Sequence, residues 1–125
     1  MPSPDLENTE TLDESQVSEL LAQPGGERSL FHRLHGIFIS EGPELIDELK
    51  RRLPEGDRSE IHDLFHKIKG SSAAMGAKRV HELAAFAVNV CRADGDLGEL
   101  ADLPDRIESE YRRYDSETQR FLESS

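Results

Sequence analysis

The fold is decided by the stretch Leu64-Phe65-His66-Lys67-Ile68-Lys69-Gly70-Ser71-Ser72. On a helical wheel at about 100° per residue, its apolar side chains fall on one side together with Ile61, and they form a stripe that a protein core would cover. His66 points roughly 150° away from the middle of that stripe. The pattern therefore predicts an amphipathic helix that holds an imidazole toward solvent.

Two of the residues that follow His66 share its exposed surface. Lys69 follows at i+3 and Gly70 at i+4, which are neighbouring positions on a helix. A cation beside an imidazole disfavours a bound metal and suits a ring that carries a negative group. Gly70 costs a helix interior about 1 kcal/mol relative to Ala. Its bare backbone would let a bulky group approach the ring closely.

Apolar residues recur at helical spacing in four other parts of the chain. These are a short segment ending near Leu21, a long one from Leu30 to Leu53, one from Val80 to Cys91, and a last one from Leu100 to Phe121. Short connections join most of them, and short connections make consecutive helices antiparallel neighbours. We therefore expect an all-α fold: an antiparallel up-down four-helix bundle with an additional short N-terminal helix.

Capping residues predict where these helices begin and end. Thr11 with Glu14 is typical of a capping box at the short helix. Asp57 with Glu60 is typical of the start of the helix that carries His66. Gly76 predicts its end, after residue 74 or 75.

Two prolines lie within the apolar periodicity. Pro43 has no N–H to donate to the preceding turn, so it predicts a kink or a break in the long segment. The apolar stripe keeps its phase across Pro43, which favours one kinked helix. Pro104 either kinks the last helix or lies in the first turn of its longer part.

The length of 125 residues suits one domain. Residues 1–10 are polar with two prolines, and we expect a disordered tail there. Residues 11–125 should form the single helical domain. Cys91 is the one cysteine, so no intrachain disulfide is possible. No apolar run reaches the length of a membrane span, and the N-terminus does not resemble a signal peptide; we expect a cytoplasmic protein.

The formal net charge of −11 argues against nucleic acid and anionic membrane surfaces as partners. The charge is uneven: residues 56–82 contain five basic and four acidic residues, a net of +1. The segment that holds His66 is thus the least acidic part of the chain. This difference could arise by chance on a solvated helix, but it would tolerate an anion on the ring.

The histidines are the candidate ligands for a metal ion. His62 and His66 have the i,i+4 spacing of two ligands on a helix. No carboxylate shares their stripe and Lys69 does, so we favour an ordinary surface pair over a metal site. We expect no metal and no cofactor on this chain. No hydrolytic nucleophile and base pair and no phosphate-binding glycine loop is evident, and a small bundle leaves little room for a substrate pocket.

The sequence from His66 to Val80 resembles the signature of histidine-containing phosphotransfer (HPt) domains. That signature is a His, a Lys three residues on, a Gly four residues on, small residues, and a second Gly followed by Ala or Leu. The segments 44–49 and 91–93 are also similar to this family, and the resemblance covers roughly Phe38 to Tyr114. It implies the same four-helix bundle that the periodicity predicts.

The resemblance also implies a role for each matched residue. His66 would accept the phosphoryl group, Lys69 would neutralise its charge, and Gly70 would leave room for the partner protein. Ser71 occupies the place of a small residue that can form a hydrogen bond at the site. The partner would dock on the surface around His66, which comprises His62, Ser71, Ala73, Ala74, Met75 and Arg92.

One position departs from the family pattern. Free-standing HPt proteins often carry Gln or Arg on the next helix, beside the reactive imidazole, where this chain has Val88. Arg92 could contribute in its place.

The function implied is that of a phosphorelay intermediate. It would accept a phosphoryl group on His66 from the aspartate of a response-regulator receiver domain and pass it to another receiver, without catalytic turnover of its own. Its partners would be receiver domains and a hybrid histidine kinase, with Mg²⁺ bound on the receiver, and we expect a monomer. The alternative is a helical adaptor or inhibitor that docks on a receiver or kinase without carrying phosphate.

Overall fold

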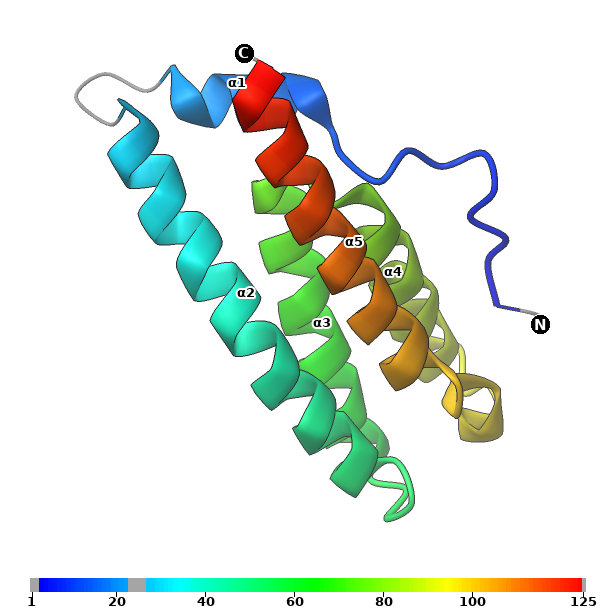
Figure 1. Cartoon of the computed structure of the whole chain (residues 1–125). Helices are drawn as coiled ribbons and strands as arrows, with labels where there is room; N and C mark the ends of the chain where they lie inside the picture. The colour runs from blue at the N-terminus through cyan, green and yellow to red at the C-terminus, as the bar shows by residue number, and fades with distance from the viewer. Residues whose placement is uncertain (1–2, 23–26, 125) are drawn as a thin grey trace.

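The computed structural model describes residues 3–22 and 27–124. Its elements are α1 (Glu14–Leu21), α2 (Glu27–Arg52), α3 (Arg58–Met75), α4 (Lys78–Arg92), the 3₁₀-helix η1 (Leu97–Leu100) and α5 (Leu103–Ser124). Helices α2 to α5 run alternately in opposite directions and lie side by side, and α1 crosses one end of them, close to the end of α5 (Figure 1). The predicted four-helix bundle with a short additional helix is confirmed.

The core lies between the four long helices. Ile61, Phe65 and Ile68 of α3 are fully buried, as the apolar stripe predicts. Leu83 of α4 and Tyr114 of α5 are also fully buried. Burial of such side chains stabilises the bundle by about 1.5–3 kcal/mol each. It also fixes the rotation of α3 about its axis, so the opposite side of this helix faces solvent.

The ends of α3 follow the predicted caps. The Asp57 carboxylate accepts a hydrogen bond from the Glu60 N–H at 3.2 Å. Gly76 ends the helix in the left-handed region at φ 73°, which an L side chain rarely adopts. These caps determine which residues of α3 lie in its middle, His66 among them.

The capping box predicted for the first helix is wrong by two residues. Asp13 is the N-cap of α1, and its carboxylate accepts from the Gln16 N–H at 3.1 Å. The carbonyl of Thr11 instead accepts from the N–H of Lys78, at 3.2 Å. This long-range contact holds the chain outside the helix at residue 11.

Both prolines are accommodated within helices. Pro43 lies inside α2, which continues as one helix from Glu27 to Arg52. Pro104 is the second residue of α5, in the first turn, where its missing N–H would have no helical partner.

Residues 3–10 lie against the bundle. Leu6 is buried, the Arg106 guanidinium donates to the Pro4 carbonyl at 2.9 Å, and the Arg79 guanidinium donates to the Thr9 carbonyl at 2.7 Å. For residues 3–10 these contacts run against the expectation of a disordered tail over residues 1–10; Met1 and Pro2 lie outside the described residues. The expectation rested on local polarity, whereas the contacts are made with residues of α4 and α5.

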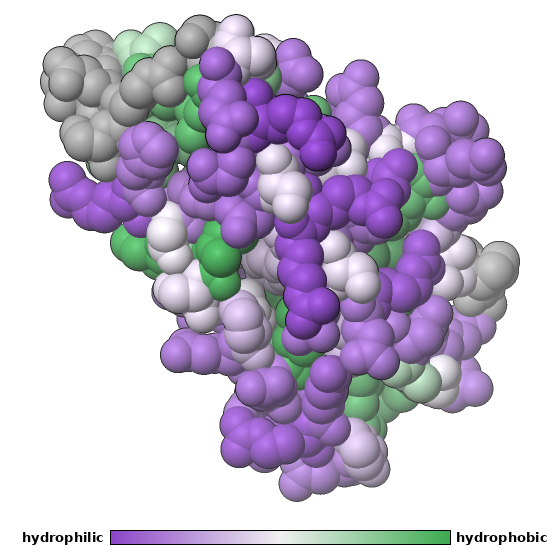
Figure 2. All heavy atoms as spheres, viewed as in Figure 1, coloured by the Kyte–Doolittle hydropathy of each residue, from purple (hydrophilic) through white to green (hydrophobic). Residues whose placement is uncertain are grey.

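One face of the molecule shows how the polar residues are distributed. The face formed by α2 and α5 is predominantly hydrophilic, with small apolar areas between polar side chains (Figure 2). Within the described part of the chain, no helix has the length and apolar character needed to cross a membrane.

Candidate functional site

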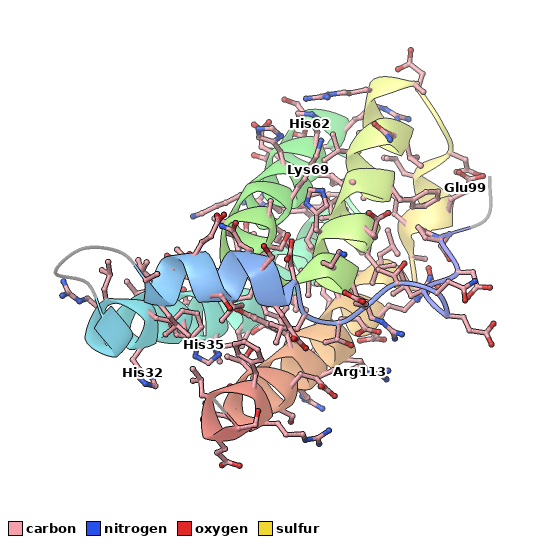
Figure 3. The ribbon with its side chains drawn as sticks, turned by 90° about the horizontal axis from the view of Figure 1, so that it is seen from above. His32, His35, His62, Lys69, Glu99 and Arg113 are labelled. Atoms are coloured by element: carbon pink, nitrogen blue, oxygen red, sulfur yellow. The ribbon has the colours of Figure 1, made fainter. Side chains whose placement is uncertain are left out.

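His66 lies in the middle of α3 and its side chain is exposed. Phe65 and Ile68 beside it are fully buried, so the helix turns the imidazole away from the core. The prediction that this ring faces solvent is confirmed. Its neighbours His62 and Lys69 project from α3 on the side next to α4, while His32 and His35 lie away from them, near α2 and α5 (Figure 3).

The two residues that follow at i+3 and i+4 leave the surface near His66 open. Lys69 is half-buried, and no ion pair or hydrogen bond engages its ammonium among the described residues. A Cβ placed on Gly70 would meet no atom within 4 Å. The fold therefore gives no steric reason for a glycine at this helical position.

His62 forms the closest ring contact of His66. The two imidazoles are stacked, with ring centroids 5.7 Å apart and planes inclined by 9°. Nδ1 of His62 lies 3.1 Å from Oδ1 of Asp63. The i,i+4 spacing predicts His62 beside His66 but not this carboxylate, because Asp63 is adjacent to His62 in the chain and does not share the stripe. The i,i+4 spacing of the two histidines was the signal for the stack.

Four of the residues predicted to dock a partner are exposed to solvent to different degrees. Ala73 and Ala74 are exposed about two helical turns beyond His66. Ser71 is half-buried, and its hydroxyl donates to the Ile68 carbonyl at 3.2 Å. Arg92 is exposed at the end of α4, and no hydrogen bond or ion pair engages it within residues 3–22 and 27–124.

Met75 does not belong to the surface predicted for docking. It is 6% exposed because it continues the apolar stripe of α3 into the core. Its carbonyl accepts a hydrogen bond of 2.6 Å from the Tyr114 hydroxyl. Its side chain therefore cannot contact a partner in this structure, and the prediction for Met75 is wrong.

A side chain of helix α4 contacts the backbone of α3 near the site. Val88 is fully buried and has no polar atom in its side chain. Nδ1 of His81 lies 3.1 Å from the carbonyl of Lys69. His81 therefore ties α4 to the turn of α3 that presents the Lys69 side chain.

Among the described residues, no three His, Cys, Asp or Glu side chains lie close enough together to hold a metal ion. His62, His66 and Asp63, although they are neighbours on α3, do not form such a group.

The model of the Hpt domain family matches residues 28–121, which include α3 and the whole site. The chain belongs to the Hpt domain family. It therefore has a phosphorelay role in histidine phosphotransfer. Proteins of this family are phosphotransfer intermediates and not classical enzymes. Hpt domains work with response-regulator receivers and histidine kinases, and this defines the general class of its partners.

Solved structures show the same fold. A histidine-containing phosphotransfer protein from Medicago truncatula, MtHPt2, superposes with a TM-score of 0.76 at 21% identity, over 94% of this Hpt chain and 81% of that one. A putative histidine-containing phosphotransfer protein from rice gives a TM-score of 0.60 at 18% identity, over 93% and 89% of the two chains. A comparison with curated protein sequences finds no match.

Proposed function

We propose that His66 is the phosphoacceptor of this Hpt domain. The observation that carries the proposal is the exposed imidazole in the middle of α3, within the region that matches the family. The ring needs a free lone pair and access to a second protein. Exposure on a rigid helix provides both.

The transfer begins on a partner, at the aspartyl phosphate of a receiver domain. A ring nitrogen of neutral His66 attacks the phosphorus in line and forms an N–P bond. The P–O bond to the aspartate breaks, and its electron pair stays on the carboxylate. A second receiver later takes the group from His66 by the reverse chemistry. Such transfers depend mainly on positioning and on neutralising charge.

Lys69 supplies the charge on this side of the complex. Its ammonium lies one helical turn from His66 and has no competing partner among the described residues. A phosphoryl group carries about two negative charges, so a charge-assisted hydrogen bond from Lys69 would stabilise it on the ring. The open surface at Gly70 lets the receiver backbone come close.

The receiver supplies the remaining chemistry: an acidic pocket and a Mg²⁺ ion. This chain then needs no cofactor and has no turnover of its own. The docking surface surrounds His66 and comprises His62, Ser71, Ala73, Ala74 and Arg92. A hybrid histidine kinase carrying a receiver would be the donor, and this chain would act as a monomer.

The test follows labelled phosphate from a phosphorylated receiver to this chain. The wild-type protein should take the label, and His66→Gln should take none. His32→Gln is the matched control, because His32 is also exposed on a long helix but lies away from the site; it should be labelled like the wild type. Label on the His66→Gln protein would refute the assignment.

The stability of the label separates this role from that of a non-phosphorylated adaptor. A phosphohistidine is lost in acid and survives base, whereas a chain that docks without carrying phosphate gives no label under either condition. The family match favours the carrier.

A further inference from the structure

The imidazole rings of His62 and His66 form a stacked pair on α3. The planes of the two rings are nearly parallel, at 9°, and their centroids are 5.7 Å apart. Nδ1 of His62 is within hydrogen-bond distance of Asp63 Oδ1, at 3.1 Å. The His62 ring is therefore anchored on the helix by Asp63, and the His66 ring is stacked on the His62 ring.

No other described group fixes the His66 ring. No hydrogen bond or ion pair involves its side chain within residues 3–22 and 27–124, and Val88 on the adjacent helix is buried and apolar. An exposed side chain without partners exchanges between rotamers in picoseconds to nanoseconds. Contact with a flat neighbour at i−4 restricts that motion.

A stacked neighbour is well suited to a nucleophilic imidazole. The lone pair of the reacting nitrogen lies in the plane of the ring. The His62 ring stacks beside the His66 ring with nearly parallel planes, and the His66 side chain remains exposed. The stack can thus limit rotation without blocking the direction of attack.

We propose that His62 is a positioning residue for phosphotransfer: its ring, anchored by Asp63, holds the His66 imidazole with its reactive edge toward the partner. The proposal rests on the proposed function of His66. It assigns His62 a role within this chain, in addition to any contact with a receiver. Misplacing a reacting group by a small distance or angle slows a transfer that depends on alignment.

Single-turnover transfer from a phosphorylated receiver tests this role with two substitutions. His62→Ala removes the ring and should slow transfer by about three- to tenfold, which is a change in barrier of roughly 0.7–1.4 kcal/mol. His62→Phe keeps a flat ring at the same position but loses the contact with Asp63, so it should recover most, but not all, of the rate lost in His62→Ala. His32→Ala, the exposed control on α2, should leave the rate unchanged.

Two outcomes would overturn the proposal. A wild-type rate for His62→Ala would show that the stack does not matter for transfer. A His62→Phe rate as low as that of His62→Ala would show that His62 acts through its nitrogen atoms and not through its flat ring.

An NMR measurement separates this inference from the proposed function. The ring protons of His66 should be shifted upfield by the stacked neighbour in the wild type and in His62→Phe, and the shift should be lost in His62→Ala. If the wild-type protein accepts no phosphoryl group, the assignment of His66 fails. The ring-current shift still decides whether His62 holds the His66 ring, and its absence in the wild type refutes the stack.

Discussion

Lys69 is half-buried on α3, and the fold makes no use of its ammonium within the described part of the chain. A long cationic side chain in that state is available for an anion on His66. Lys69→Ala should therefore slow phosphotransfer and shorten the lifetime of the phosphohistidine, each by about tenfold, the factor that corresponds to the loss of roughly 1.4 kcal/mol of charge-assisted hydrogen bonding. Single-turnover transfer and decay of the label measure the two effects.

Lys67→Ala is the matched control for this prediction. Lys67 is exposed on the same helix, and its substitution changes the net charge by the same amount, but the residue points about 100° away from His66 around the helix axis. We expect less than a twofold effect. Equal effects of the two substitutions would mean that the overall charge of the surface matters and not the position of Lys69.

At the scale of one element, helix α2 contains two glycines in very different surroundings. A Cβ on Gly42 would lie 2.9 Å from the ring of Tyr111, which is 5% exposed and cannot easily move aside. A Cβ on Gly36 would meet nothing within 4 Å. Gly42 is therefore needed for the close approach of α2 and α5, and Gly36 is not.

Alanine substitutions should separate these two cases. Alanine is favoured over glycine in a helix interior by about 1 kcal/mol, so Gly36→Ala should stabilise the protein by up to about that amount. Gly42→Ala forces the Tyr111 ring to shift and should destabilise it by about 1–2 kcal/mol despite the same gain in propensity. Urea unfolding of both variants gives the two free energies. Stabilisation by Gly42→Ala would contradict the predicted clash.

The elements differ in how well their sequences predict them. Helix α3 was predictable because its signals are local: Asp57 caps it, Gly76 ends it, and the apolar stripe lies between them. The start of α1 was not predictable from local signals, because the carbonyl of Thr11 accepts a hydrogen bond from the N–H of Lys78, which is far away in the sequence. A capping pattern alone cannot exclude such a competing contact.

The residues of the site also differ in how far the sequence predicts their positions. The exposure of His66 follows from helical periodicity, and so does the proximity of Lys69. The stack on His62 depends on rotamers, which spacing permits but does not determine. Met75 was misplaced because small residues around Gly70 suggested a continuous surface, whereas its register on α3 places it in the core.

At the scale of the whole molecule, the contact between α2 and α5 buries a titratable group. His35 is 8% exposed, stacks on Phe31 with centroids 5.7 Å apart, and meets the edge of Tyr114 at 5.7 Å. Burial lowers the pKa of His35; the nearby Asp115 carboxylate opposes this effect, and His32 adds to it. Nε2 of His35 lies 3.4 Å from Oδ1 of Asp115.

The lowered pKa makes the stability of the bundle depend on pH. The unfolded chain binds a proton on His35 near its ordinary pKa of about 6.5, before the folded chain does. The contribution of neutral His35 is thus fully present above that pKa and is lost as the pH falls through the lower pKa of the folded state, with a slope of at most about 1.4 kcal/mol per pH unit. Urea unfolding between pH 7.5 and 5 measures this loss in the free energy of unfolding.

Two variants test the assignment to His35. His35→Leu should lose less stability over this pH range, because it removes the proton uptake at this position. His32→Leu, at an exposed position of the same helix, should lose stability almost as the wild type does. An identical pH dependence of the wild type and His35→Leu would mean that His35 does not couple folding to proton binding.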